Sequence, residues 1–344
     1  IMKKLVALLV VATMLLGLTA CGGSDAKDKK LTVWVSGAGA QVDAMKAACE
    51  AFEEETGYTV EFSAPGDTYE ELMKTRMASN ELPDLFTTHG WSVLRYSEYL
   101  YPVNDLEWSS RINPQIKSVI TDENGQMFVL PLDVDIAGIV YNVEVCEKSG
   151  VNVDEIKTWN DFLAACEKIK AAGFNPIHMG GKDSWTIGQF FDWAAPSYFI
   201  TNEKTSLAKD LLAGKFDEET WIKVASLLDT MVKNGYINAD ALTADYQADL
   251  KSLATGKTAF GFYGNYAISE AKAYNADAKL GMFPIPAATE DDEPTLISGE
   301  RTAVGVWKDS KNLDQALELL NYLAQDSSVK TIATGSGCSA GLTG

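Results

Sequence analysis

The segment Leu31-Thr32-Val33-Trp34-Val35 is the first of three strand patterns that alternate with two helix patterns. Apolar residues recur with a helical period from residue 42 to residue 56, and a second strand pattern follows at residues 59–63. A second helix is expected over residues 67–80 and a third strand over residues 84–88. Strand, helix, strand, helix, strand is the order of a parallel sheet with crossover helices, so this part of the chain predicts an α/β fold.

The sequence beyond residue 88 departs from this simple winding. Thr158 is expected to cap a helix that begins with Trp159-Asn160-Asp161, and the chain from there to residue 255 has mainly helical patterns. Further strands are expected at residues 136–141, 258–263, 280–284 and 302–307, and a last helix at residues 313–324. A chain of 344 residues exceeds one ordinary hydrophobic core, which favours two lobes.

The start of the chain has the pattern of an export signal. Lys3 and Lys4 precede an apolar run that is shorter than the roughly 20 residues a helix needs to span a bilayer. The run ends in Leu18-Thr19-Ala20-Cys21, which resembles the lipobox of bacterial lipoproteins. We expect residues 1–20 to be a signal peptide, Cys21 to carry a lipid, and residues 21–30 to be a tether. A transmembrane anchor or a chance cysteine is the alternative interpretation.

The charge of the chain excludes two classes of partner. The net charge is −19, and loss of Lys3 and Lys4 with the signal peptide would lower it to −21. Such an acidic protein repels phosphate backbones and anionic lipid headgroups, so we expect neither nucleic-acid binding nor electrostatic docking to a membrane.

The cysteines and histidines give no sign of a metal site. No Cys-x-x-Cys motif occurs, and His89 and His178 are far apart in the sequence, so we expect no zinc site, no other metal and no cofactor. The four remaining cysteines permit disulfides without requiring them; Cys49 and Cys166, on apolar helix faces, are better explained as small buried side chains. These four residues are Cys49, Cys146, Cys166 and Cys338.

Short segments spread over residues 31 to about 325 carry a family resemblance. They include residues 31–37, 83–86, 130–142, 158–162, 180–185, 256–260, 264–266 and 310–312. In their order and spacing they resemble the extracytoplasmic solute-binding proteins of ABC-type sugar importers, the family that includes maltose-binding protein. Tyr266 stands where that family commonly has tryptophan, so an aromatic ring is kept but its size and hydrogen bonding change.

The resemblance implies a two-lobe fold of the type II periplasmic-binding class, with hinge strands between the lobes. The chain would cross near Leu132 to Ile136, return near Met282 to Pro286, and cross again after Leu323. The family usually continues beyond the equivalent of Gly344, so C-terminal helices are expected to be missing and apolar surface to be exposed on the second lobe. The expected first lobe comprises residues 31–133 and 282–325, and the second, more helical lobe residues 134–281 and 326–344.

A sugar presents apolar faces and a rim of hydroxyl groups, so its site needs aromatic walls and fixed polar groups where the lobes meet. His89 and Trp91 follow the third strand, and loops at the carboxyl ends of parallel strands face such a crevice. Trp185 follows Gly180-Gly181, a backbone that can approach a ligand closely because it lacks side chains. The other expected ligand-binding residues are Ser36, Asp135, Tyr263, Asn265, Tyr266, Glu300 and Arg301.

Several of these assignments have a structural alternative. Trp91 would otherwise be a core aromatic, His89 a hydrogen-bonded loop residue, and Asp135 part of a hinge turn. Asn265 would otherwise be a helix N-cap, and Glu300-Arg301 a surface ion pair of little energetic value.

The resemblance implies a monomeric binding protein held outside the bacterial cytoplasmic membrane by its lipid alone. It would capture a carbohydrate, an oligosaccharide, between two lobes and deliver it to the permease of an ABC importer, without catalysis. A first alternative is the same scaffold with a polyamine or a peptide as ligand. A second is an exported glycoside hydrolase, which would need two carboxylates facing each other across a cleft. The identities of the sugar and the permease are left open.

Overall fold

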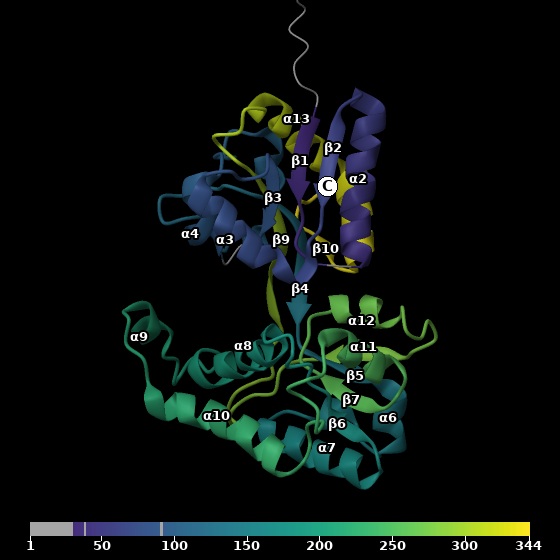
Figure 1. Ribbon diagram of the computed structural model, residues 1–344. Helices are drawn as coiled ribbons and strands as arrows, with labels where there is room; N and C mark the ends of the chain where they lie inside the picture. The colour runs from purple at the N-terminus through teal and green to yellow at the C-terminus, as the bar shows by residue number, and fades with distance from the viewer. Residues whose placement is uncertain (1–29, 38, 90–91) are drawn as a thin grey trace, which may run out of the picture.

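The computed structural model describes residues 30–37, 39–89 and 92–344, and it divides into two lobes, each built on one sheet (Figure 1). The expected signal peptide, the expected lipid attachment residue Cys21, nearly all of the expected tether and the predicted ligand contact Trp91 lie outside the described residues. Within the described part of the chain, no helix combines the length and the apolar character that crossing a membrane requires.

The first lobe contains a six-stranded sheet in the order β10-β4-β9-β3-β1-β2. Its strands are β1 (Lys30–Trp34), β2 (Thr59–Ser63), β3 (Leu85–Thr88), β4 (Leu130–Ala137), β9 (Ile297–Val306) and β10 (Ser339–Ala340). Its helices are α2 (Ala40–Thr56), α3 (Tyr69–Ser79), α4 (Val93–Tyr96), α5 (Pro114–Lys117), α13 (Leu313–Leu323) and α14 (Asp326–Ser336). β1 pairs in parallel with both β2 and β3, which confirms the α/β start expected from the sequence.

Periodicity of apolar residues explains this start. Leu31 and Val33 are fully buried in β1, and α2 buries one face that includes Met45 and Phe52. Gly57 ends α2 in the left-handed conformation at φ 72°, where its backbone N–H bonds to the carbonyl of Glu53. Burial of the matching faces of strand and helix is the main contribution to the stability of this layer.

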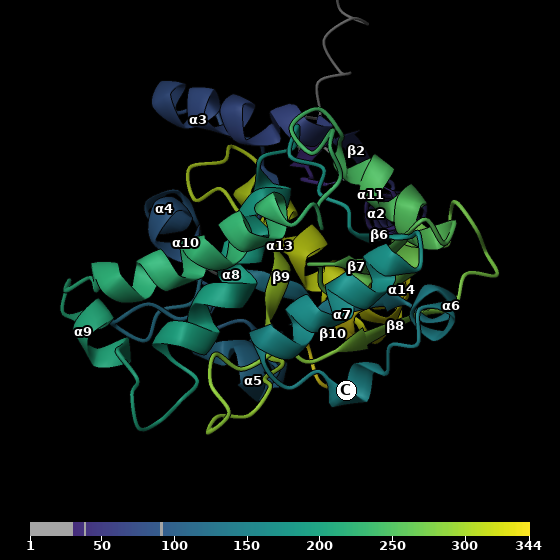
Figure 2. The same ribbon diagram turned by 90° about the horizontal axis from the view of Figure 1, so that it is seen from below.

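The second lobe contains a four-stranded sheet in the order β6-β7-β5-β8. Its strands are β5 (Ile139–Asn142), β6 (Asn175–Ile177), β7 (Thr258–Gly261) and β8 (Leu280–Phe283). Its helices are α6 (Val143–Lys148), α7 (Trp159–Ala171), α8 (Trp185–Phe199), α9 (Ala208–Leu212), α10 (Glu218–Lys233), α11 (Tyr246–Ala254) and α12 (Tyr266–Ala271). α8, α11 and α12 lie on the side that faces the first lobe, whereas α7 and α10 lie on the far side (Figures 1 and 2).

β4 and β9 join the two lobes as an antiparallel pair, with Leu130 opposite Val304 at one end and Ala137 opposite Ile297 at the other. Leu130 belongs to the core of the first lobe and Ala137 to that of the second, so the chain first crosses between the lobes within β4. The return was expected near residues 282–286. β8 is instead an edge strand of the second sheet, and β9 brings the chain back.

The C-terminal segment corrects a second expectation, since residues 326–344 were assigned to the second lobe. α14 packs against α2 of the first lobe, and β10 pairs with β4. A Cβ atom added at Gly335 would lie 2.4 Å from the Cβ atom of Ala44, so the two helices are in close contact. Ile332 of α14 is buried in the core of the first lobe. This burial and the contact with Ala44 keep α14 on the first lobe.

The four cysteines of the described residues are free. Cys49, Cys146 and Cys166 are buried, and burial raises the pKa of the Cys49 and Cys146 thiols to about 12. These thiols therefore stay protonated at neutral pH, as expected for small buried side chains.

Candidate functional site

Arg301 of β9 extends its side chain from the junction of the lobes onto α12 of the second lobe. Its Nη2 atom donates to Oε1 of Glu270 at 3.0 Å, and its Cζ atom lies 4.0 Å from the centre of the Tyr266 ring. The side chains of Arg301 and Glu270 are 18% and 17% exposed. The sequence suggested a pair of Glu300 with Arg301, but the acidic partner is Glu270 and the pair is largely shielded from solvent.

Arg301 keeps its positive charge at neutral pH. Burial alone would lower its pKa, but the carboxylates of Asp133 and Glu270 outweigh burial and place the pKa above its ordinary value. Nη1 of Arg301 is buried and has no hydrogen-bond partner among the residues that the structure describes. A buried guanidinium donor without a partner is costly.

Asp135 lies in β4 beside the same ring. Burial raises the pKa of Asp135 to about 6, and the charge of Arg301 limits the rise. Gly264 makes room for this arrangement, because an added Cβ atom would lie 2.6 Å from the Tyr266 ring and 2.8 Å from Oδ2 of Asp135. The crossover thus contains a carboxyl group whose protonation changes in the mildly acidic range.

Three aromatic rings meet where α8 and α11 begin. Trp185 contacts Tyr246 edge-on with ring centres 4.7 Å apart, and Tyr263 lies 6.2 Å from Trp185 and 5.2 Å from Tyr246. Tyr246 and Tyr263 are buried, whereas Trp185 is 42% exposed. The two tyrosines therefore support a tryptophan that keeps part of its surface in solvent, the arrangement that stacking on a sugar ring requires.

Asp249 ties this aromatic group to the preceding loop. It is fully buried and accepts hydrogen bonds from Nδ1 of His178, from the hydroxyl of Tyr263 and from the backbone N–H of Gly180 at 2.8 Å. An added Cβ atom at Gly180 would lie 2.4 Å from the backbone of Asp245. The absence of a side chain at Gly180 thus serves contact with the protein's own backbone, not the ligand approach expected from the sequence.

Tyr266 differs from the open stacking platform that the resemblance implied. It is 5% exposed, and the guanidinium of Arg301 lies over its ring. Its hydroxyl forms hydrogen bonds with the side-chain amide of Gln189 on α8, at 3.0 Å from Nε2 and 3.2 Å from Oε1. Its aromatic face is occupied by Arg301.

Asn265 precedes α12, but its side chain makes no capping hydrogen bond. Its Oδ1 atom accepts from the backbone N–H of Ile136 at 2.9 Å, and its Nδ2 atom donates to the carbonyl of Gly337 at 3.1 Å. Asn265 therefore fastens the second lobe to β4 and to the end of α14, a role that neither the sugar-contact nor the N-cap interpretation described.

The remaining predicted residues lie on the first-lobe side. Nδ1 of His89 donates to the backbone carbonyl of Arg301, and burial lowers the pKa of His89, so its ring is neutral at pH 7. Ser36 accepts from the hydroxyl of Thr87 at 3.1 Å, at the ends of β1 and β3. Glu300 is 6% exposed and lies opposite Val134 in the β4–β9 ladder.

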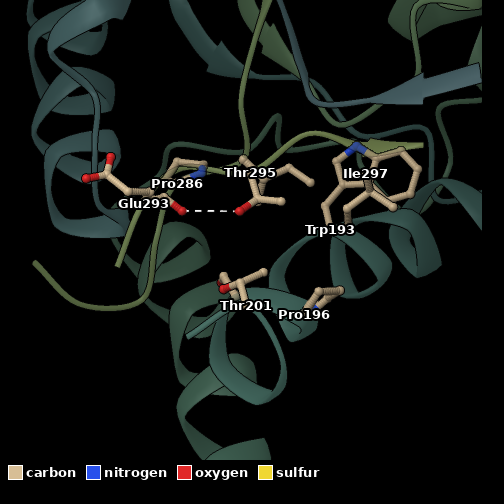
Figure 3. A pocket seen from close by; sticks show the side chains of 9 residues that line it. Trp193, Pro196, Thr201, Pro286, Glu293, Thr295 and Ile297 are labelled. Carbon is tan, nitrogen blue, oxygen red and sulfur yellow. Dashed lines mark hydrogen bonds between the residues drawn. The ribbon is translucent and has the colours of Figure 1, made fainter. Parts of the chain in front are cut away.

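A shallow pocket of about 190 Å³ lies elsewhere, between α8 and the connection from β8 to β9 (Figure 3). Trp193, Pro196, Thr201, Pro286 and Ile297 are among the residues that line it, and no residue expected to bind the ligand does. The 190 Å³ counts space that is open to solvent, and the pocket encloses almost no volume of its own, whereas typical small-molecule sites enclose roughly 300 to 1,000 Å³. We therefore place the candidate site at the junction of the lobes.

We call the linked side chains at this junction the boundary network. Its members are Trp185, Gln189, Tyr246, Tyr263, Tyr266, Glu270 and Arg301. The sequence pointed to Trp185, Tyr263, Tyr266 and Arg301, and missed the other three. Glu270 and Gln189 look like ordinary polar residues on helix faces, and Tyr246 like an apolar position at the start of a helix. The only sequence signal for Tyr246 is its place next to the N-cap residue Asp245.

The described residues contain no group of three histidine, cysteine or acidic side chains placed to hold a metal ion. The boundary network is suited to binding by stacking and hydrogen bonds.

Three comparisons with known proteins bear on this arrangement. The chain is 30% identical to the melibiose/raffinose/stachyose-binding protein MelE of Bacillus subtilis (strain 168) over 344 residues, which cover 97% of this chain and 80% of MelE. It is 31% identical to a sugar transporter protein of Bacillus licheniformis whose crystal structure is a complex with stachyose, with a TM-score of 0.82 over 91% of this chain and 83% of that one.

A third structure, RafE in complex with raffinose, is 18% identical with a TM-score of 0.75 over 91% of this chain and 83% of that one, and supports the two-lobe fold alone. The family of bacterial extracellular solute-binding proteins, which is not an enzyme family, matches residues 38–330. The chain therefore belongs to the bacterial extracellular solute-binding proteins.

Proposed function

We propose that this protein captures an oligosaccharide of the raffinose and stachyose type between its lobes and delivers it to the permease of an ABC importer. The observation that carries the proposal is the exposed ring of Trp185, supported by two buried tyrosines beside the crossover strands. The sugar ligands named for MelE and for the B. licheniformis protein support the same class of ligand for this chain.

The polar side of the proposed site fits a neutral, hydroxyl-rich ligand. Nη1 of Arg301 is a buried donor without a partner among the described residues, and Gln189 supplies an amide that can donate and accept. A sugar hydroxyl group can accept a hydrogen bond from Arg301 and can donate to or accept from Gln189. These bonds would align a sugar whose apolar face lies on Trp185. A ligand without those hydroxyls would leave the buried donor unpaired, and this loss is the basis for selectivity.

Two carboxylates of the site, Glu270 and Asp249, are poorly placed for glycoside hydrolysis. Both oxygens of Glu270 accept hydrogen bonds, from Arg301 and from Tyr246, and both oxygens of Asp249 are likewise occupied. A hydrolase needs one carboxyl group free to donate a proton and a second free to attack or to activate water. We therefore expect binding without turnover.

A melting experiment with a panel of ligands tests the proposal. A ligand at about 100 times its dissociation constant adds about 2.7 kcal/mol to the free energy of unfolding, which gives a clear rise in melting temperature. We expect a rise with raffinose or stachyose, none with putrescine or a peptide, and no release of reducing sugar. Stabilisation by putrescine or the peptide alone would reject a carbohydrate ligand.

The anchor is a separate part of the proposal. We propose that Cys21 is the lipid-bearing first residue of the mature protein, because the apolar run, the small residues and the cysteine occur in the order of a lipobox. The variant Cys21→Ser should lose labelling by a palmitate analogue and leave the membrane fraction. Labelled, membrane-bound Cys21→Ser protein would contradict this assignment.

A further inference from the structure

Glu270 holds together two groups that belong to different parts of the molecule. Its Oε1 atom accepts from Nη2 of Arg301 at 3.0 Å, and its Oε2 atom accepts from the hydroxyl of Tyr246 at 2.8 Å. Arg301 lies on β9, a strand that joins the lobes, and Tyr246 opens α11 of the second lobe. A single carboxylate therefore bridges the crossover strand and the interior of the second lobe.

The tyrosine at the other end of this bridge supports Trp185. The rings of Tyr246 and Trp185 are 4.7 Å apart and inclined at 61°, which is an edge-to-face contact. Tyr246 is 9% exposed and Trp185 is 42% exposed. The Tyr246 ring therefore supports Trp185 from the buried side, and the Trp185 ring is the surface that a ligand can reach. The position of Trp185 therefore depends on where the Tyr246 hydroxyl is held.

A second connection runs in parallel from Arg301 to the same helix. The Arg301 guanidinium lies over the Tyr266 ring, and the Tyr266 hydroxyl bonds to Gln189, one turn after Trp185 on α8. Both connections begin at Arg301 and end at the start of α8. A change in the position of β9 relative to the second lobe would therefore act on Trp185 by two routes.

We propose that Glu270 is a positioning residue that couples the crossover strand β9 to the stacking surface of Trp185, through Arg301 on one side and Tyr246 on the other. This inference rests on the proposed sugar-binding function and adds a mechanism to it. When the lobes move about β4 and β9, Arg301 shifts with β9 and Glu270 transmits the shift to Tyr246. We call the chain of contacts from Arg301 through Glu270 to Tyr246 the relay. A sugar stacked on Trp185 in turn favours the lobe arrangement in which the relay is intact.

The chain offers a matched pair of variants for the test. Tyr246→Phe removes the hydroxyl that bonds to Glu270 and leaves the ring beneath Trp185. Tyr236→Phe is the control, because the Tyr236 hydroxyl donates to Glu167 at the same distance of 2.8 Å and its ring is 4% exposed. Tyr236 follows the end of α10, and its hydroxyl bonds to Glu167 of α7, so its loss of a tyrosine–glutamate bond removes no contact of Arg301, Glu270 or Tyr246.

The first measurement needs no ligand. Hydrogen exchange of backbone amides in residues 183–190 should become faster in Tyr246→Phe, in Glu270→Gln and in Arg301→Lys, and stay unchanged in Tyr236→Phe. Unchanged exchange in the three relay variants, or an equal change in the control, would overturn the relay.

The second measurement uses raffinose and stachyose. Tyr246→Phe should weaken binding about three- to ten-fold, the scale of one hydrogen bond, and Tyr236→Phe less than about two-fold. In a Trp185→Ala background, Tyr246→Phe should have no further effect, because the relay acts through that ring. An equal loss in both backgrounds would show that Tyr246 does not act through Trp185. If the wild-type protein binds no saccharide, the proposed function fails, while the exchange measurement still decides the relay.

Discussion

At the scale of single residues, Trp185 is distinguished by a large ring that is accessible yet held on one side by other rings. Large aromatic side chains bury most of their surface in folded proteins, and those that keep an exposed face at a fixed position often contact ligands. Tyr246 and Tyr263 fix Trp185, so little of its freedom remains to be lost when a ligand binds.

We predict that Trp185→Ala weakens sugar binding by about 1 to 4 kcal/mol and changes the melting temperature of the free protein little. Titration calorimetry and a melting curve measure the two effects. Trp221→Ala is the matched control, because Trp221 is 37% exposed but packs on Phe191 and lies on α10. A sharp fall in melting temperature with unchanged affinity would make Trp185 a core residue.

Asp135 gives the site a dependence on pH. Burial raises its pKa to about 6, so in the mildly acidic range the folded protein retains a proton that the unfolded chain has released. The folded state then binds more protons, and the contribution of Asp135 to the free energy of unfolding falls as the pH rises through this window.

The variant Asp135→Asn should therefore gain stability relative to the wild type as the pH rises from about 4 to about 7. Urea unfolding of both proteins across this range measures the difference. We expect nearly equal stabilities at the acidic end and a more stable variant at neutral pH. A difference that stays constant with pH would show that Asp135 does not titrate there.

At the scale of helices and strands, the elements with strong local signals were predicted well. Thr158 and Asp161 form the full capping box of α7, and the three strands and two helices of the first lobe lie within a few residues of their expected positions. The helix expected from residue 67 begins at Tyr69, after a short turn over Gly66–Thr68. Local hydrogen bonding and apolar period determine such elements, and both can be seen in the sequence.

Contacts between distant elements could not be predicted in the same way. The place of α14 depends on the fit of Gly335 against Ala44, and the bond of Glu270 to Arg301 depends on the fold that brings α12 to β9. Residue type identified Trp185 and Arg301 as candidates, but only the fold shows that Tyr246 and Glu270 connect them. In the same way, the Arg301 guanidinium lies over the Tyr266 ring only because β9 and α12 are in contact, and no local sequence pattern predicts that contact.

The contact of α14 with α2 leads to a prediction about two glycines in helices. Gly335→Ala should lower the free energy of unfolding by about 1 to 3 kcal/mol, because the new methyl group would overlap Ala44. Gly188→Ala in α8 is the control, since nothing lies within 4 Å of its added Cβ atom, and it should raise the free energy of unfolding by about 0.4 to 1 kcal/mol. Stabilisation by both changes, measured by urea unfolding, would contradict the close contact.

At the scale of the whole molecule, two lobes with separate cores are joined by β4 and β9, and the boundary network lies beside these strands. In this arrangement, small rotations about two strands change the distance between the lobes while each core stays intact. The antiparallel pair of β4 and β9, the arginine that crosses the junction and the exposed tryptophan together favour a protein that binds by closing around its ligand.

The most direct test of this account is a crystal structure of the protein with raffinose or stachyose. We predict that one sugar ring stacks on Trp185 and that a hydroxyl group of the sugar accepts a hydrogen bond from Nη1 of Arg301. The sugar should lie between the lobes, with Tyr246 bonded to Glu270 behind the tryptophan. A sugar bound away from Trp185, for example in the shallow pocket beside Trp193, would contradict the account.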